Sequence, residues 1–181
     1  MSITKEELRS IVISRTANFQ DRFDSDTRFS KSKRYGILKS EIKETKLAKK
    51  LNDLVEIIDG YLDQAYVNGG SYNKATTKKL KEEYLIALDK NLDEAIKLIG
   101  IEAVKECFIE IDDSNMSKTH LSFFHVQETF EKYKLDVKDW RIKEITPTEI
   151  LVYDNSINKL LKPSNYKKAN LKPILQKYGY C

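Results

Sequence analysis

Hydrophobic residues recur at helical spacing through the first hundred positions of the chain. Near the start, Thr4 and Glu7 have the spacing of a capping box, in which each residue satisfies a backbone N–H of the other. This pattern predicts a helix that begins at Lys5 and fades near Asn18. Its expected buried residues are Leu8, Ile11 and Val12.

Two longer helices are predicted next. One apolar series keeps helical period from about Leu38 to Val67 and stops at the glycine pair in residues 68–70, which is typical of a helix end. Another series runs from about Thr77 to Ile99 and is followed by a glycine. Because only a short glycine-rich turn separates the two, we expect them to form a long antiparallel hairpin.

The pattern is weaker beyond residue 100. Residues 107–111 have the composition of a short strand, residues 112–118 that of a loop, and residues 122–135 show helical spacing again. Residues 146–161 fit either a helix with a capping box or a β-hairpin around a Thr-Pro-Thr turn. The hairpin is favoured because Asp154-Asn155-Ser156 is poor helix material.

These elements together predict a mainly α protein of the α+β class, with a small β element near the C-terminus. A last short helix is expected through residues 171–178, ending at a glycine. At 181 residues the chain is interpreted as one domain. Its expected parts are a helical core over residues 1–154 and a basic arm over residues 155–181.

Composition favours a soluble globular protein that is not secreted. Hydrophobic residues make up 40% of the chain and charged residues 33%, and apolar runs fall far short of the roughly 20 residues that span a bilayer. The first ten residues contain acids where a signal peptide needs a basic flank. Two distant cysteines, Cys107 and Cys181, suggest no disulfide framework and fit a reducing compartment.

Charge is segregated along the chain. The net charge of +4 is the balance of +3 in residues 1–35, +6 in residues 155–181 and −5 in the residues between them. A chain with basic ends and an acidic middle can bind its own neighbour head to tail, and such contacts close into rings when the rotation permits. Basic ends can equally bind phosphates of nucleic acid without sequence specificity.

One candidate binding segment is RFDSDTRFSKSKRYG, at residues 22–36, which interleaves cations with aromatic side chains. Three interpretations stay open: a solvated loop whose aromatics pack into the core, a strap that binds another protein, and a nucleic-acid site. Three aspartates in and beside the segment oppose the last of these. The candidate binding residues here are Arg28, Lys31, Lys33, Arg34 and Tyr35.

The C-terminal segment is the stronger candidate. Its six cations are all lysines, which lack the forked guanidinium that reads bases, so sequence-specific DNA recognition is not expected. We expect an arm that lies on an acidic protein surface, with hydrophobic anchors supplying much of the affinity. The candidate cations are Lys159, Lys162, Lys167, Lys168, Lys172 and Lys177, and the candidate anchors are Tyr166, Leu171, Ile174, Leu175 and Tyr178.

No constellation of residues predicts catalysis, so we expect a protein that is not an enzyme and binds no cofactor or metal. His120 and His125, the only histidines, are five apart and do not share a face of a helix or strand. Asp112, Asp113 and the two histidines are the basis of a less favoured alternative, a metal-dependent nuclease. Trp140, the only tryptophan, is interpreted as a packing anchor of the C-terminal part.

The function predicted from these features is a structural subunit of a multi-copy assembly. Richness in Lys, Ile, Asn and Tyr is typical of AT-rich coding, so the assembly is interpreted as a virus particle and the subunit as a bacteriophage connector, ring or adaptor component. The expected partners are other copies of the chain and neighbouring acidic proteins, in the virion or the host cytoplasm. The alternatives are a non-specific nucleic-acid-binding protein and a small inhibitor of a host protein.

Overall fold

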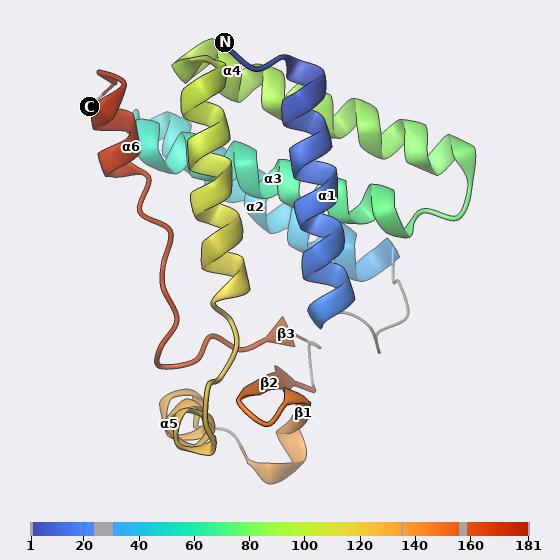
Figure 1. Ribbon diagram of the computed structural model, residues 1–181, viewed down its shortest axis with the longest axis vertical. Helices are drawn as coiled ribbons and strands as arrows, with labels where there is room; N and C mark the ends of the chain where they lie inside the picture. Colours follow the sequence, from blue (N-terminus) through green and yellow to red (C-terminus); the bar gives the residue numbers. More distant parts are fainter. Residues whose placement is uncertain (1, 24–30, 135, 156–158, 181) are drawn as a thin grey trace. The chain divides into compact units, whose positions relative to one another are not determined.

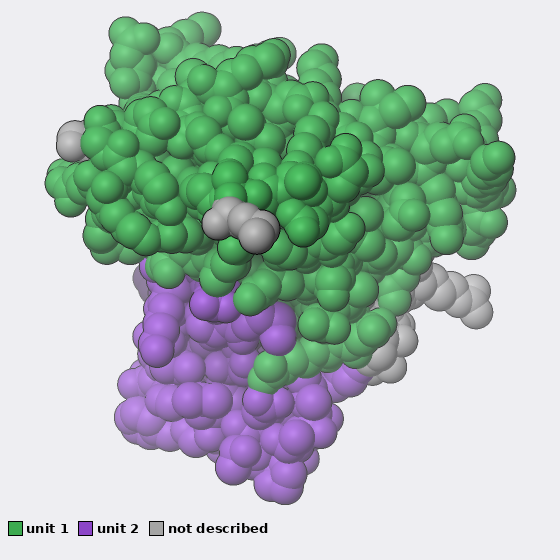
Figure 2. Space-filling view, turned by 45° about the horizontal axis from the view of Figure 1, so that its top comes forward, with its two compact units in different colours: residues 1–112, 170–181 green, residues 113–169 purple. Residues whose placement is uncertain are grey.

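A computed structural model describes residues 2–23, 31–134, 136–155 and 159–180, with the backbone alone at residues 31–33, 137 and 159. Its contacts form two compact units, coloured separately in Figure 2. Unit 1 comprises residues 1–112 and 170–181, and unit 2 comprises residues 113–169. The predicted division into a core and an arm at residue 155 stays a prediction.

The fold is mainly α with a small antiparallel sheet, as the sequence predicted. Helices account for 71% of the described residues. The helices are α1 (Lys5–Phe23), α2 (Lys31–Leu51), α3 (Leu54–Lys74), α4 (Lys78–Met116), α5 (Phe123–Tyr133), the 3-10 turn η1 (Val137–Asp139) and α6 (Lys172–Lys177) (Figure 1). The strands are β1 (Trp140–Thr146), β2 (Glu149–Asp154) and β3 (Lys159–Leu160).

Helix α1 begins as predicted and ends later. The Thr4 N–H donates to Glu7 Oε2 at 2.7 Å, and the Glu7 N–H donates to Thr4 Oγ1 at 3.2 Å, so the capping box is formed. The helix runs past Asn18 to Phe23 because its buried face continues. The buried residues of α1 are Leu8, Val12, Thr16, Gln20 and Phe23.

The single helix expected over residues 38–67 is wrong, because the chain turns at Asn52 and forms two helices, α2 and α3. Asn52 has a φ of 54°, a left-handed conformation that asparagine tolerates better than most residues. Asp53 then caps α3, its side chain accepting a hydrogen bond from the Glu56 N–H at 3.2 Å. The polar pair at the turn was therefore a helix boundary that the apolar periodicity concealed.

The predicted stop at Gly69-Gly70 is also wrong, because both glycines lie inside α3 where it meets α1. A Cβ on Gly69 would approach Thr16 Oγ1 to 2.9 Å, and one on Gly70 would approach Gln20 Nε2 to 2.5 Å. Both positions therefore permit close packing of two helices. Helix α3 continues to Lys74, and α3 and the first segment of α4 run antiparallel, as the predicted hairpin required (Figure 1).

Gly100 divides α4 into two segments that point in different directions (Figure 1). Its φ of 71° and ψ of 160° are strongly disfavoured for residues with a side chain, so the predicted end of a helix at this glycine is confirmed. The strand expected at residues 107–111 and the loop at 112–118 are wrong, since a second helical segment continues to Met116. It buries Cys107, Phe108 and Ile111 at helical spacing.

The core of unit 1 is formed by α1, α3 and both segments of α4. Aliphatic residues from all three helices are almost fully buried, and a row of aromatic rings connects the helices. The ring of Phe19 lies 5.5 Å from that of Tyr66, which lies 5.9 Å from that of Phe108. The most buried aliphatic residues include Leu8, Val12, Ile58, Leu62, Leu88, Leu92 and Val104.

Unit 2 contains α5 and the three-stranded sheet, whose order is β1-β2-β3. The β-hairpin favoured for residues 146–161 is confirmed, with Ile142 opposite Val152 and a register shift between Glu144 and Thr146. The Trp140 ring stacks on Phe130 at 4.0 Å, which confirms Trp140 as a packing anchor. The other members of this cluster are Val126, Ile142, Ile150, Val152 and Leu161.

His120 joins the sheet to α5 inside unit 2. Its backbone exchanges two hydrogen bonds of 2.8 Å with Ile150, and its ring lies between the Ile150 carbonyl (3.2 Å) and Thr129 Oγ1 (2.8 Å). Burial lowers the pKa of His120 to about 4, so the ring is neutral at pH 7. The Thr129 hydroxyl donates to the His125 C=O at 2.9 Å, which holds the threonine beside the ring.

A glycine at the contact of α2 and α3 gives the first prediction. A Cβ at Gly60 would overlap Thr45 Oγ1, whereas a Cβ at Gly36 on α2 meets nothing within 4 Å. We expect Gly60→Ala to lower the free energy of unfolding by about 1–3 kcal/mol, and Gly36→Ala to raise it by about 0.5–1 kcal/mol through helix propensity. Urea unfolding of both variants checks this, and equal effects would contradict the packing of α2 on α3.

The buried ring of His120 predicts a pH dependence of stability. Between pH 6.5, the ordinary value, and about pH 4 the unfolded chain binds a proton that the folded chain rejects. The free energy of unfolding should therefore fall as pH drops through this window, by at most about 3 kcal/mol, and this contribution should be absent in His120→Gln. An NMR titration of the His120 ring measures the cause directly, and a midpoint at or above 6.5 would contradict it.

Candidate interaction surface

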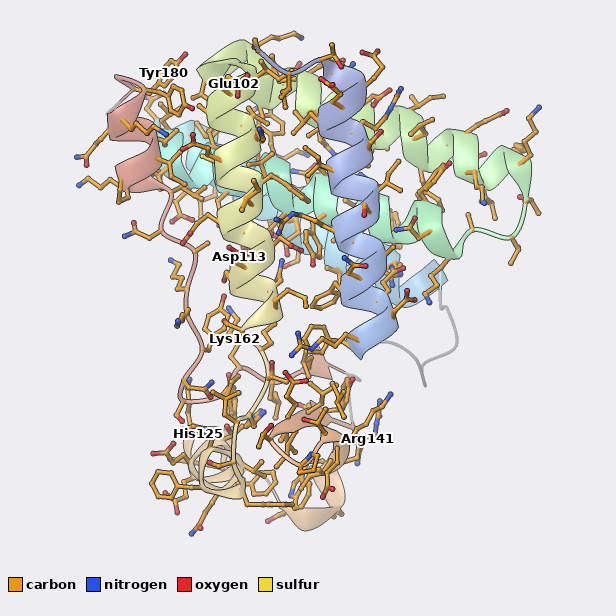
Figure 3. All side chains as sticks on the ribbon, in the orientation of Figure 1. Glu102, Asp113, His125, Arg141, Lys162 and Tyr180 are labelled. Atoms are coloured by element: carbon orange, nitrogen blue, oxygen red, sulfur yellow. The ribbon has the colours of Figure 1, made fainter. Side chains whose placement is uncertain are left out.

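Three glutamates line one face of the second segment of α4. Glu102, Glu106 and Glu110 are four residues apart, a spacing that places side chains above one another on a helix. Glu102 Oε1 accepts the Ile3 N–H at 2.8 Å, and Glu110 Oε1 accepts the Asn170 N–H at 3.0 Å. We call these three residues the glutamate row; Glu102 is labelled in Figure 3.

Glu106, the middle member of the glutamate row, binds α6 and the residue after it. Lys177 Nζ lies 2.6 Å from Glu106 Oε1, and the Tyr178 hydroxyl donates to the same oxygen at 2.8 Å. The hydrogen bond from Lys177 lowers the pKa of Glu106, and the same contact raises the pKa of Lys177. The glutamate row therefore contacts both ends of the chain within unit 1.

Apolar burial fixes the end of the chain more firmly than the ion pair does. Leu171 is 2% exposed and Leu175 is fully buried, whereas the Lys177 side chain is 60% exposed. Burying a leucine is worth about 1.5–3 kcal/mol, while exposed ion pairs contribute little. Two of the predicted partner anchors thus pack against their own chain in this structure, and Ile174 and Tyr178 are half-buried beside them.

Residues 161–169 are bound by hydrogen bonds to other residues of unit 2. The hydroxyls of Tyr166 and Ser114 lie 2.9 Å apart, and the Lys167 N–H donates to Ser117 Oγ at 3.0 Å. Ser164 Oγ donates to Glu128. The segment has no helix or strand, yet its polar groups bind the chain itself.

The tail lysines remain on the surface while the tail is held. The side chain of Lys159 lies outside the description, and Lys162 Nζ lies 4.6 Å from the ring centre of Tyr166. The exposed tail cations are Lys162, Lys167, Lys168, Lys172 and Lys177. The tail is therefore attached to its own chain through apolar and backbone groups, and its lysines form a basic surface.

The described residues of the candidate strap, at 22–36, lie on two different helices, α1 and α2. Phe23 is buried on α1, where its ring lies 4.6 Å from that of Phe19, so this aromatic belongs to the core. Arg34 lies in α2, with Nη1 3.0 Å from the Cβ position at Gly70, and Tyr35 is 67% exposed. Lys31 and Lys33 lie in α2 with backbone alone described, and Arg28 lies outside the described residues.

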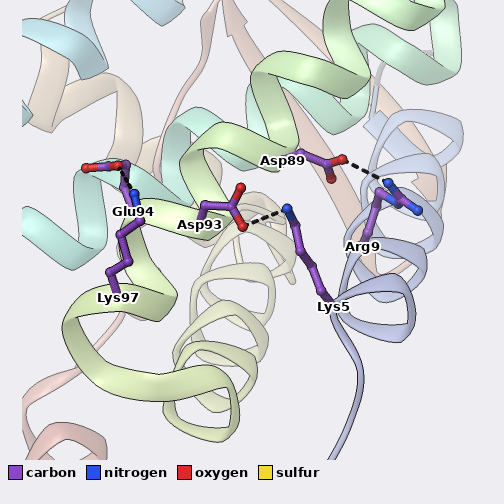
Figure 4. Close-up of polar contacts among 6 residues, drawn as sticks. All are labelled: Lys5, Arg9, Asp89, Asp93, Glu94 and Lys97. Carbon is purple, nitrogen blue, oxygen red and sulfur yellow. Dashed lines mark hydrogen bonds and ion pairs between the residues drawn. The ribbon is translucent and has the colours of Figure 1, made fainter.

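A second set of charges joins α1 to the first segment of α4 (Figure 4). Lys5 Nζ lies 2.6 Å from Asp93 Oδ1, and Arg9 Nη1 lies 2.8 Å from Asp89 Oδ2. Both acids line an open depression of about 490 Å³ on α4. Because each carboxylate there already has a cationic partner, the arrangement is suited to holding helices together.

Asp112, one residue of the nuclease alternative, has structural partners. Asp112 is 3% exposed, lies 2.7 Å from Arg15 Nη1 and accepts the Tyr66 hydroxyl at 3.0 Å. Asp112 is therefore a buried link between three helices and does not lie in the loop that was predicted for residues 112–118. Within the described ranges, no group of three or more His, Cys, Asp or Glu side chains is arranged to hold a metal ion. Absence of enzymatic activity stays a prediction.

The chain matches no family model, and neither the curated proteins nor the solved structures yield a significant match. Among the described residues, no helix is both long and apolar enough to cross a membrane.

The glutamate row was missed because the sequence analysis assigned residues 107–111 to a strand. The predicted strand contains Glu110 but neither Glu102 nor Glu106, so the helical face that the three residues share was not visible. The signal was present in the helical spacing of Val104, Phe108 and Ile111, which are buried on the opposite face.

The third prediction separates apolar from charged attachment of the tail. Leu175→Ala should raise amide hydrogen exchange throughout α6, because removing a buried leucine costs about 2–5 kcal/mol. Glu106→Gln should raise exchange much less, and Glu83→Gln, an exposed control on α4, should leave it unchanged. Fast exchange in α6 of the wild-type protein would contradict attachment of the tail.

Proposed function

We propose that the protein is a structural subunit without catalytic activity, which binds other copies of itself in a multi-copy assembly. The observation that carries the proposal is the row of exposed tail lysines on a segment that its own chain holds in place. A basic surface that is already ordered loses less conformational entropy on binding than a free arm does. The tail then acts as a docking surface, in place of the detached arm expected from the sequence.

Charge segregation supports contact between copies. The tail carries +6 and residues 36–154 carry −5, so the tail of one copy meets the opposite sign on the body of the next. Such a head-to-tail contact uses two different surfaces, so it produces a ring when the rotation closes. The assembly that we propose is a bacteriophage particle, with this protein as a connector, ring or adaptor component. The richness of the chain in Lys, Ile, Asn and Tyr, which is typical of AT-rich coding, supports that assignment.

Non-specific nucleic-acid binding is the alternative that uses the same lysines. Stacking on bases would need free aromatic faces beside the cations. The Tyr166 ring instead lies under Lys162, and the Tyr178 hydroxyl binds Glu106. These contacts favour a protein partner over single-stranded nucleic acid.

Sedimentation velocity tests the proposal. We expect wild-type protein to form oligomers near 0.1 M salt and to dissociate as salt approaches 1 M, where the screening length falls from about 10 Å to about 3 Å. Replacing Lys162, Lys167, Lys168 and Lys172 by glutamine should abolish the oligomers. The matched control replaces Lys39, Lys43, Lys46 and Lys50, four exposed lysines of α2, and should keep them.

Two outcomes would contradict the proposal. One is a wild-type protein that stays monomeric at low salt over the full concentration range. The other is equal loss of oligomers in both lysine variants, because that would show dependence on net charge and not on the tail. Tight binding of an oligonucleotide by wild-type protein, lost in the tail variant alone, would favour the alternative.

A further inference from the structure

Strand β1 is an edge of the sheet in unit 2. The strand order is β1-β2-β3, so β1 pairs with β2 alone. An unpaired edge presents backbone N–H and C=O groups that can bind another strand. Natural sheets often protect such edges, so the side chains of β1 should determine which strands can pair with it.

The register identifies the backbone groups that face outward. Ile150 directs both its N–H and its C=O to His120, at 2.8 Å each, and the Val152 C=O accepts from Leu161 at 2.8 Å. These residues of β2 therefore direct their groups away from β1. In an antiparallel pair the residues opposite them direct theirs away as well. Those residues on β1 are Trp140, Ile142 and Glu144.

The alternate residues of β1 bind inward, which agrees with this assignment. The Asn155 N–H donates to the Asp139 C=O at 2.8 Å, so the odd-numbered positions face β2. Within the part of the chain that the structure describes, no backbone partner reaches Ile142 or Glu144 on the outer side. Glu144 is exposed and Ile142 is half-buried, so the edge is accessible in unit 2.

Like charges disfavour the pairing of two copies of β1 with each other. Antiparallel pairing centred on Ile142 places Arg141 of one copy opposite Lys143 of the other. Shifting the register by one hydrogen-bonded pair places Arg141 against Arg141 or Lys143 against Lys143. Like charges directly opposite are destabilising in a sheet, so every such register of a symmetric dimer is disfavoured.

The same side chains define the strand that would fit. Arg141 lies with its guanidinium 4.4 Å from the ring centre of Tyr153, on one face of the sheet (Figure 3). Ile142 packs on the other face, against the cluster that includes Val152. An incoming strand therefore meets positive charge on one face and an apolar cluster on the other.

We propose that the outer edge of β1 binds an extended segment of a partner protein as a fourth, antiparallel strand. The segment alternates apolar and acidic side chains, with an apolar residue opposite Ile142 and an acid opposite Arg141. Positions opposite Arg141 and Lys143 are non-hydrogen-bonded pairs, in which side chains approach most closely, so the acids lie within reach of the cations. The register shift after Glu144 ends the binding edge.

This site goes beyond the proposed function and does not depend on it. It uses backbone groups of unit 2 and none of the tail lysines, so a monomeric protein without assembly activity can still be tested for it. Addition of a strand to an exposed edge obtains affinity from main-chain hydrogen bonds and selectivity from alternate side chains.

The test uses full-length protein and a synthetic peptide that alternates valine with glutamate. Trp140 lies on β1 and is the only tryptophan, so its emission reports binding of a peptide without aromatic residues. We expect a saturable change in emission, with the same midpoint by calorimetry. A peptide that alternates valine with lysine should bind about tenfold more weakly, since attractive cross-strand pairs become repulsive.

Methylation of peptide amides tests the geometry without altering the protein. Valine amides point toward β1 in the proposed pairing, and glutamate amides point away. N-methylation of the valines should therefore abolish binding, whereas N-methylation of the glutamates should preserve it. On the protein, Glu144→Pro removes an outward N–H and should weaken binding at least tenfold, while Glu144→Ala should not.

Charge on the protein is tested by Arg141→Glu, which should weaken binding of the acidic peptide about tenfold. The control Lys138→Glu makes the same change of charge at an exposed position before the strand. The proposal is overturned if the wild-type protein does not bind the valine-glutamate peptide, or if methylating the valines has no effect. Equal affinity for the valine-lysine and valine-glutamate peptides would contradict the acidic character that we propose for the partner.

Discussion

The two ends of the chain meet because three glutamates lie four residues apart on one helical segment. Helical spacing aligns Glu102, Glu106 and Glu110, and each accepts a hydrogen bond from a residue near one terminus. The row exists as a separate surface only because Gly100 ends the preceding segment with a φ of 71°. A straight helix through residue 100 would point the row elsewhere, and the ends would lose their common support.

Attachment within the chain changes how its segregated charge can act. The tail does not present a flexible basic arm, because Leu171 and Leu175 pack into unit 1 and its polar groups bind the chain itself. What remains for a partner is the set of lysines that point outward from an ordered segment. Electrostatic contact of this kind is screened by salt. Backbone pairing at β1 is a second kind of contact, which salt affects less.

Local chemistry predicted those elements whose signals lie next to one another in the sequence. The Thr4–Glu7 capping box, the end at Gly100 and the hairpin favoured for residues 146–161 were all found, because short-range sterics and hydrogen bonding determine them. The break at Asn52 was missed because the apolar pattern continues across it. Gly69 and Gly70 were misread because their role is close packing on α1, which depends on residues 50 or more positions away. The glutamate row and the link from Asp112 to Arg15 likewise depend on contacts between distant segments.

Cross-linking in a mixture of labelled proteins tests the attachment of the tail to its own chain. A carbodiimide joins a lysine to a carboxylate in direct contact, and Lys177 Nζ lies 2.6 Å from Glu106 Oε1. Light and ¹⁵N-labelled proteins are mixed, cross-linked and digested, and the peptide that contains this pair is weighed by mass spectrometry. We expect light–light and heavy–heavy pairs alone, because the tail of each copy binds its own glutamate row. Mixed light–heavy pairs in quantity would show that the tail binds the glutamate row of another copy, and would contradict it.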